Sequence, residues 1–438
     1  MNERINIHIL LFTSPEKKFI LNREWTRRIY HMNIGHEGVT AAMGFQAAGG
    51  HTGIKKGNTK DMAMIYSIVP CVVAGTFTTN LVKAAPVKWD QHVVHDSKSA
   101  QAVVINSGIA NAATGEQGYE ACRKTAEAAS RELHIPADSV LIGSTGVIGA
   151  QIPVDVIEKG IHLLAPMLDN SREAAGIAAQ SIMTTDTHPK EVSVSIELGG
   201  KMVTIGGMCK GAGMIHPNMC TMLSFLTTDA VISGTMLQEA LSTVVKDTYN
   251  MISVDGDTST NDTCVIMANG LAGNPDITSR GEDYDKFVEA LFAVNRELAK
   301  MIAGDGEGAT RLFEVRVVNA KTKDQAVTLA KSIVTSNLTK AAIYGRDANW
   351  GRILCAMGYS GAKFDPENVD LYFESKAGKI KIVENSVSTG YSEEEATRIL
   401  SEDAVTCIAD IKMGSEEATA WGCDLTYDYI KINADYRS

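Results

Sequence analysis

Residues 103–142 read VVINSGIANAATGEQGYEACRKTAEAASRELHIPADSVLI, and this stretch sets the class of the fold. Its two apolar ends, at 103–106 and 140–142, are typical of buried strands, and the alanine-rich residues 118–133 between them are typical of a helix. Past Gly38, short β-rich runs continue to alternate with helical segments. This alternation favours a mixed α/β protein built in layers.

Other patterns predict further elements. Residues 192–205 alternate apolar and polar side chains around Gly199-Gly200, which is typical of a hairpin with a two-residue turn. Apolar side chains from Phe287 to Ile302 recur at intervals of four, three, four and four, so they share one face of a helix that ends near Gly304. The remaining predictions are strands at 370–373 and 379–383, a capping box of Ser392 and Glu395 before a helix to Leu400, and a strand over 424–438.

Length and charge limit the function. The 438 residues suffice for two or three domains at about 100–200 residues each. The net charge of −11 argues against a nucleic-acid partner, and no apolar run approaches the ~18–20 residues of a membrane span. Eight scattered cysteines without metal-ligand spacing indicate reduced thiols of a cytoplasmic protein and no metal site. Residues 1–38 are predicted to be a loose N-terminal extension, not a secretory signal.

The most unusual segment is KGAGMIHPNMCT at 210–221, directly before the strand-like residues 222–228. Its glycines and proline exclude regular structure just before a buried strand, where a backbone can be held bent. It does not match a phosphate-binding loop, because Gly211 and Gly213 lack the third glycine and a strand follows in place of a helix.

A second candidate is Gly143-Ser144-Thr145-Gly146, which follows a predicted strand. A glycine-flanked threonine can direct a backbone N–H and a hydroxyl to one point, as an oxyanion hole requires. An ordinary strand-to-helix turn is the alternative. His188 and His216 favour structural hydrogen bonds over catalysis or metal binding. Glu307, among glycines, is either a loop carboxylate or a group directed into a cleft.

Together these segments resemble one family, the ornithine acetyltransferases, also called glutamate N-acetyltransferases, of arginine biosynthesis. The likeness runs from about Val39 to Ser438. The motifs that carry it are GFQAAG from Gly44, NSGIANAATG from Asn106, STGVIG from Ser144, KGAGMIHPNMCT from Lys210, DGDTSTNDT from Asp255, GRDANWGRI from Gly345 and YIKINADYRS from Tyr429. The resemblance implies the layered mixed α/β architecture of the ornithine acetyltransferase and DmpA-like family, similar in logic to N-terminal nucleophile hydrolases.

The resemblance also implies a precursor that cuts itself between Cys220 and Thr221. The products would be an α chain over 39–220, preceded by the extension, and a β chain over 221–438, assembled as a heterotetramer of two chains of each kind. Thr221 would then carry a free α-amine with an unperturbed pKa of about 7.7–8.0, suited to act as a base beside its own hydroxyl nucleophile.

The reaction implied is ping-pong transfer of an acetyl group from N2-acetyl-L-ornithine to Thr221 and then to L-glutamate. Thr145 and Gly146 match the family's oxyanion hole. The positions that match its substrate contacts are Thr184, Lys210, Thr221, Glu307, Asn433 and Ser438. No metal or organic cofactor is implied, and use of acetyl-CoA as a further substrate is left open.

Three positions depart from the family pattern: Cys220 stands in place of alanine, Ile109 in place of asparagine and Ser438 in place of threonine. None of them removes a predicted catalytic group. Two alternatives remain from the residues alone. One is a hydrolase with the same nucleophile in which water accepts the acyl group, and the other is an uncleaved protein that binds amino acids.

Overall fold

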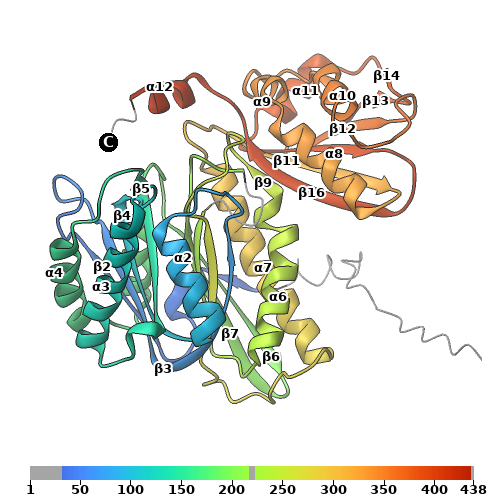
Figure 1. Cartoon of the computed structure of the whole chain (residues 1–438). Coiled ribbons are helices and arrows are strands. Elements are labelled where there is room, and N and C mark those ends of the chain that lie inside the picture. Colours follow the sequence, from blue (N-terminus) through green and yellow to red (C-terminus); the bar gives the residue numbers. More distant parts are fainter. Residues whose placement is uncertain (1–31, 217–221, 436–438) are drawn as a thin grey trace, which may run out of the picture.

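The computed structural model describes residues 32–216 and 222–435, which form a larger and a smaller lobe, each built on one sheet (Figure 1). In the described part of the larger lobe the strand order is β1–β6–β7–β8–β10–β3–β4–β5, and β2 also pairs with β3. The strands are β1 (Ile34–Gly35), β2 (Phe45–Gly50), β3 (Met62–Phe77), β4 (Ser99–Ile109), β5 (Val140–Val147), β6 (Lys190–Leu198), β7 (Lys201–Lys210), β8 (Leu223–Thr228) and β10 (Thr263–Ala268). The helices are α2 (Ala85–His92), α3 (Gly115–Leu133), α4 (Val154–Leu164), α5 (Arg172–Ser181), α6 (Gly234–Asp247) and α7 (Glu282–Gly304).

The strand–helix–strand unit predicted from residues 103–142 is confirmed. Strands β4 and β5 are parallel neighbours, with Val103 opposite Leu141, and α3 connects them. Parallel strands require such a crossover, because a tight turn cannot return the chain to the same end of the sheet. The prediction of a mixed α/β fold is therefore confirmed.

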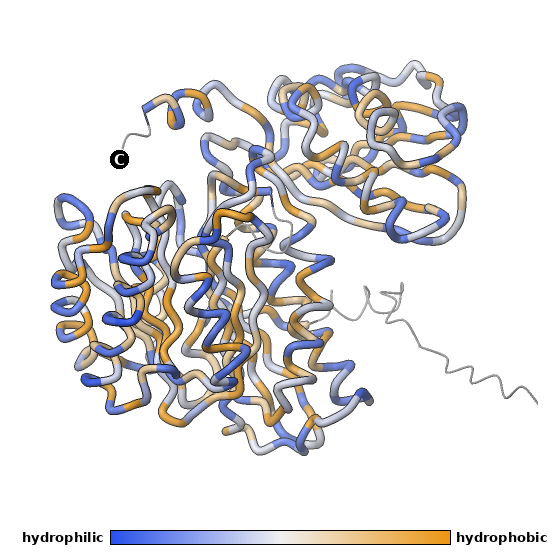
Figure 2. The backbone as a smooth tube through the Cα atoms, in the orientation of Figure 1, coloured by the Kyte–Doolittle hydropathy of each residue, from blue (hydrophilic) through white to orange (hydrophobic). Residues whose placement is uncertain are grey.

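The hairpin and the long helix are confirmed as well. Strands β6 and β7 pair from Lys190–Cys209 to Leu198–Lys201, and Gly199 and Gly200 both have positive φ, as this turn requires. Helix α7 covers these strands with the predicted apolar face, whose side chains from Phe287 to Ile302 are fully buried. Figure 2 shows the same pattern, with apolar residues lining the interior of the lobe and hydrophilic residues on the outer turns of the helices.

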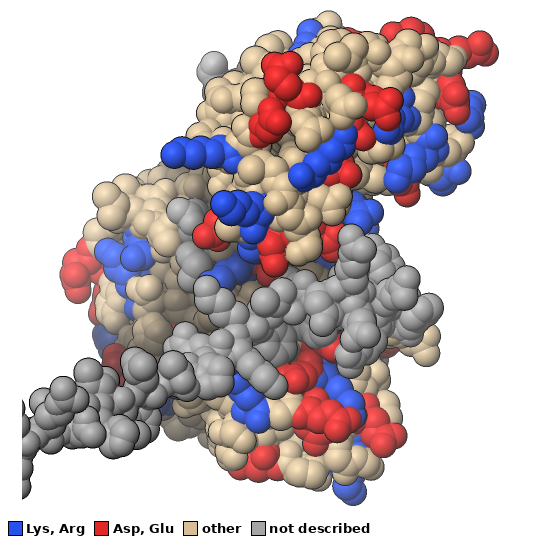
Figure 3. All heavy atoms as spheres, turned by 90° about the vertical axis from the view of Figure 1, so that its right-hand side faces the viewer, with Lys and Arg blue, Asp and Glu red and all other residues tan. Residues whose placement is uncertain are grey.

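The smaller lobe has the strand order β14–β13–β12–β15–β11–β16–β9. Its strands are β9 (Ile252–Ser253), β11 (Leu312–Ala320), β12 (Asp370–Ser375), β13 (Gly378–Glu384), β14 (Val387–Ser388), β15 (Ala404–Asp410) and β16 (Glu416–Cys423). Its helices are α8 (Lys323–Thr335), α9 (Asn337–Tyr344), α10 (Trp350–Gly358) and α11 (Glu393–Leu400). The predicted strands near residues 370 and 380 are confirmed, and the Ser392 side chain accepts a hydrogen bond from Glu395 N at 3.2 Å. Figure 3 shows acidic and basic side chains interspersed over this lobe.

The prediction of a strand over 424–438 was wrong. Residues Tyr427–Asp435 form helix α12, which extends from the smaller lobe back over the larger one (Figure 1). None of its described residues is buried. The sequence therefore lacks the regularly spaced apolar residues by which a helix that packs on a core is recognised. The position of α12 is set by hydrogen bonds from Thr426 and Asn433 to Gly308 and Glu307, in the loop after α7.

Two other segments have a more regular backbone than the sequence indicates. Residues 143–146, expected just after a strand, lie within β5 itself. Within the predicted extension, Ile34 pairs with Val194 through β1. Among the described residues, no helix combines the length and the apolar character that a membrane crossing needs.

Candidate active site

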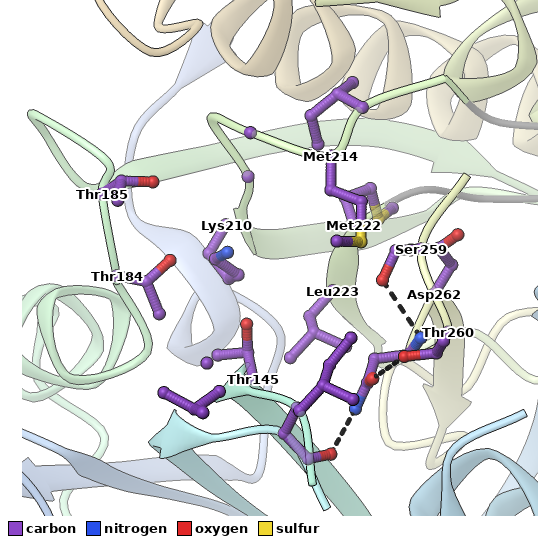
Figure 4. Close-up of a pocket in the computed structure, with 18 of the residues that line it drawn as sticks. Thr145, Thr184, Thr185, Lys210, Met214, Met222, Leu223, Ser259, Thr260 and Asp262 are labelled. Atoms are coloured by element: carbon purple, nitrogen blue, oxygen red, sulfur yellow. Dashed lines mark hydrogen bonds between the residues drawn. The ribbon is translucent and has the colours of Figure 1, made fainter. Parts of the chain in front are cut away.

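A pocket of about 330 Å³ lies where β5, β7 and β8 meet the loops before β6 and after α7. Six of the residues predicted from the family resemblance line it, namely Thr145, Gly146, Thr184, Lys210, Glu307 and Asn433. Met222, the residue after the predicted nucleophile, lines it too. Cys220, Thr221 and Ser438 lie outside the described residues. In Figure 4 the side chains of Thr145, Thr184 and Lys210 gather on one side of this pocket.

Thr145 and Gly146 occupy the end of β5, next to the end of β4. Gly146 has a φ of +127°, and a Cβ at this position would overlap the backbone of Gly108 on β4. Only glycine fits this close approach of two backbones. Asn261 also ties the ends of β4 and β5 together, because its Nδ2 donates to the carbonyl oxygen of Ser144 at 2.8 Å and to that of Ala110 at 2.5 Å.

Lys210 is the last residue of β7, paired with Leu223 at the start of β8. It is buried, and its ammonium nitrogen lies 3.9 Å from Asp186 Oδ2. Burial favours the neutral form of Asp186, but the positive charges of Lys210 and Lys190 outweigh that effect and lower the pKa of this carboxyl group. Asp186 is therefore ionised, and its carboxylate places a fixed negative charge next to Lys210.

Glu307 lies in the loop after α7 and contributes a carboxylate to the pocket. Its backbone N–H donates to Ala212 O at 2.8 Å, and a side chain at Gly213 would overlap the carboxylate of Glu307. Asn433 Nδ2 on α12 donates to Glu307 Oε2 at 2.8 Å. Thr426 Oγ1, just before α12, donates to Gly308 O at 2.6 Å, so this terminal helix is attached beside Glu307.

The pocket thus carries an ammonium group from β7 and a carboxylate from the loop after α7. This pair of charges is complementary to a small molecule that bears both a carboxylate and an ammonium group. Within residues 32–216 and 222–435, no group of three or more His, Cys, Asp or Glu side chains is arranged to hold a metal ion.

The two histidines considered from the sequence do not line the pocket. His216 Nδ1 lies 3.1 Å from Ser253 Oγ, and burial lowers the pKa of this imidazole. His188 is half exposed, and its Nδ1 lies 3.4 Å from Asp305 Oδ1. Both therefore have local hydrogen-bond or ion-pair partners at the edge of the site.

Sequence reasoning missed several residues that shape the pocket. Asn261 and its neighbours Ser259, Thr260 and Asp262 all line it, although their motif was noted only as part of the family resemblance. Asp186 and Lys190 carried no recognisable signal, because an isolated charged residue gives no indication that it will be buried.

Comparisons with known proteins agree with these features. The model of the ArgJ family matches residues 46–438. The chain is similar to the arginine biosynthesis bifunctional protein ArgJ of Thermotoga neapolitana, with 51% identity over 396 residues that cover 90% of this chain and 99% of that protein. The ArgJ 1 protein of Clostridium acetobutylicum is 49% identical over 406 residues, which cover 92% of this chain and 98% of that one. Among solved structures, the arginine biosynthesis bifunctional protein of Bacillus halodurans is 50% identical, covers 48% of this chain and 97% of its own, and has a TM-score of 0.46.

Proposed function

This chain belongs to the ArgJ family, and from that premise we propose that it is a self-processing N-acetyltransferase of arginine biosynthesis. Its substrates are small molecules: the acetyl group moves from N2-acetyl-L-ornithine to L-glutamate. The observation that carries this proposal is the pocket in which Thr145, Gly146, Lys210 and Glu307 surround Met222 and the start of β8, which begins two residues after Thr221.

The first step we propose is self-cleavage. Thr221 Oγ attacks the carbonyl carbon of Cys220, the peptide bond is replaced by an ester, and the nitrogen of Thr221 becomes a free amine. Water then hydrolyses the ester, which leaves a carboxylate on Cys220 and restores the Thr221 hydroxyl. The products are residues 1–220 and 221–438.

Acetyl transfer follows at the same residue. The α-amine of Thr221 accepts the proton of its hydroxyl as Oγ attacks the acetyl carbonyl of N2-acetylornithine, and the proton passes to the departing amine of ornithine. The glutamate amine then attacks the acetyl-threonine ester and restores the free hydroxyl. Thr145 and Gly146 stabilise the oxyanion of both tetrahedral intermediates, consistent with the close backbone approach at Gly146.

Opposite charges hold the substrates. Lys210 binds a substrate carboxylate, and Glu307 binds the side-chain ammonium group of ornithine. Asn433, already hydrogen-bonded to Glu307, together with Thr184 and Ser438 supplies further hydrogen bonds. We propose no metal or organic cofactor. A heterotetramer of two chains of each kind stays a prediction from the resemblance, and a cytoplasmic location stays a prediction from the cysteine pattern. The use of acetyl-CoA stays open.

The first test is the intact mass of the denatured protein. We expect two fragments, the second beginning at Thr221, and we expect Thr221→Ser to cleave as well because it keeps a hydroxyl. Thr221→Ala should remain a single chain of 47.0 kDa. A wild-type chain that stays whole after long incubation would exclude the mechanism and favour an uncleaved binding protein.

The second test is the release of ornithine from N2-acetylornithine with and without glutamate. Glutamate-dependent release, with one N-acetylglutamate formed for each ornithine, supports the transferase. Release at the same rate into water alone would identify a hydrolase with the same nucleophile.

A further inference from the structure

Three segments that line the pocket meet at one set of buried charges, formed by Asp186, Lys190 and Asp305. We name these three residues the buried ion cluster. They lie in the loop before β6, at the start of β6 and just after α7. Asp186 and Lys190 have fully buried side chains, and that of Asp305 is 3% exposed.

Lys190 is the centre of the cluster. Its Nζ donates to Asp186 Oδ1 at 2.7 Å, to Asp305 Oδ2 at 2.5 Å and to the carbonyl oxygen of His188 at 3.4 Å. These three acceptors match the three N–H donors of an ammonium group. Burial lowers the pKa of Lys190, but the charges of Asp186 and Asp305 outweigh this effect and raise it.

The two carboxylates connect Lys190 to the pocket. Asp186 accepts the backbone N–H of Thr184 at 3.0 Å and that of Gly211 at 2.7 Å. Asp305 accepts the backbone N–H of Thr187 at 3.0 Å and lies two residues before Glu307. The cluster therefore links three segments that carry proposed substrate contacts.

Lys210 approaches the cluster without joining it. Its Nζ lies 3.9 Å from Asp186 Oδ2, beyond hydrogen-bond distance, and it makes no hydrogen bond with another described residue. Asp186 Oδ1 is occupied by Lys190, whose positive charge offsets the attraction of Asp186 for a second ammonium group. The donors of Lys210 consequently remain available to a molecule in the pocket.

We propose that Lys190 is a positioning residue which holds Asp186 and thereby keeps Lys210 available for the substrate carboxylate. This inference rests on the proposed function, because it concerns how the same pocket binds N2-acetylornithine. Without the Lys190 charge, Asp186 would attract the nearest remaining cation, which is Lys210. The Lys210 ammonium would then form a full ion pair with Asp186 and compete with substrate.

The test compares Lys190→Met with the double variant Lys190→Met/Asp186→Asn. We expect Lys190→Met to raise the KM for N2-acetylornithine about tenfold or more, the scale of a lost hydrogen bond to a charged group, with a smaller change in kcat. The second substitution removes the charge that captures Lys210, so the double variant should have a lower KM than Lys190→Met. A purely structural role predicts that stability, kcat and KM all recover together, because Asp186→Asn also removes an uncompensated buried charge. The positioning role predicts that the recovery is confined mainly to the KM.

The matched control is Asp229→Asn. Asp229 is also buried and also accepts two backbone N–H groups, those of Met43 and Thr204, but it follows the far end of β8. Its substitution should lower stability and leave the KM unchanged. Thermal unfolding and intact mass of each variant establish that the kinetics refer to folded and cleaved protein.

The affinity for ornithine, measured by calorimetry for wild type and both Lys190 variants, gives the same comparison without catalysis. An unchanged KM and affinity in Lys190→Met, or a double variant that binds no better than the single one, would overturn the positioning role. A wild-type protein that binds ornithine but transfers no acetyl group would overturn the proposed function alone, and the affinities would still decide the role of Lys190. A wild-type protein that binds no ornithine would overturn both.

Discussion

The two lobes contain the same small charge motif, an aspartate between two lysines, in different surroundings. In the larger lobe Asp186 lies between Lys190 and Lys210, and all three are buried. In the smaller lobe Asp370 Oδ1 lies 2.6 Å from Lys412 Nζ, and its Oδ2 lies 3.1 Å from Lys381 Nζ. The side chains of Lys412 and Lys381 are 29% and 31% exposed, so water reaches the ammonium groups.

The surroundings decide what each motif does. Asp370, whose own side chain is 8% exposed, also accepts the backbone N–H of Asn385 at 2.9 Å, so its cluster joins β12, the turn after β13 and the loop after β15. Both of its lysines are already paired with it. In the larger lobe Lys190 is hydrogen-bonded to the aspartate, whereas Lys210 lies 3.9 Å from it, beyond hydrogen-bond distance, and lines a pocket. The same combination of one aspartate and two lysines therefore fixes strand positions in one lobe and supports the proposed binding site in the other.

The largest difference between the motifs should appear in stability. Removing one partner from a buried ion pair leaves an uncompensated charge, so we expect Lys190→Met to lower the free energy of unfolding by about 3–5 kcal/mol. Lys412→Met removes an ion pair that water screens and should cost about 1 kcal/mol or less. Urea unfolding of both variants in the uncleaved Thr221→Ala background measures the two values on a single chain. Equal losses would show that burial does not distinguish the clusters.

The second comparison uses two glycines with positive φ. At Gly146 an added Cβ overlaps the backbone of Gly108, whereas at Gly378 in the smaller lobe the nearest atom is the Arg398 side chain at 3.6 Å. We expect Gly146→Ala to displace the proposed oxyanion hole and to lower kcat/KM by about 10²–10³-fold. Gly378→Ala should strain its turn by about 1–3 kcal/mol and leave kcat/KM unchanged. Comparable activity of the two variants would exclude a catalytic role for the Gly146 backbone.

The smallest expected effect is a loss of stability at low pH through Asp370. Burial favours the neutral form of Asp370, but hydrogen bonds from Lys412, Asn385 and Lys381 outweigh it and lower the pKa of Asp370 to about 2. Its unfolded pKa is about 3.9, so its contribution to stability is complete above about pH 4 and is lost as the pH falls towards 2. Asp370→Asn should therefore weaken the dependence of the unfolding midpoint on pH in this window. If the pH dependence of the unfolding midpoint were the same in Asp370→Asn and wild type, the folded protein would not lower the pKa of Asp370.

Local rules predicted much of the fold from sequence. The apolar runs around residues 103 and 140, the Gly199-Gly200 turn and the apolar face of α7 each satisfy a periodicity or a backbone requirement within a few residues. Helix α12 was missed because it buries no side chain, so its alternating Tyr and Ile residues suggested a strand. Its conformation depends on hydrogen bonds to Glu307 and Gly308, more than one hundred residues away.

The family resemblance predicted Thr145, Lys210 and Glu307 as site residues, and the structure places all three in one pocket. The residues that support it were not, since Lys190 meets Asp305 only through the tertiary fold, across 115 positions of sequence. No local pattern distinguishes Lys190 from a solvent-exposed lysine at the start of a strand. The resemblance thus identified residues that line the pocket, whereas the buried charges behind them required the structure.

The pairing of β7 with β8 has a consequence for whether the protein, once cut, could refold after it has been unfolded. These antiparallel neighbours flank the proposed cut, with Lys210 opposite Leu223, so cleavage severs a loop while the ladder of hydrogen bonds persists. The two proposed pieces would therefore assemble while they are still one molecule, when the search for a partner is intramolecular. Once cut and unfolded, they would have to find each other by diffusion, and refolding would depend on their concentration. After self-processing, efficient folding from a single chain would no longer be available. A cell would then replace unfolded enzyme by new synthesis and not by refolding.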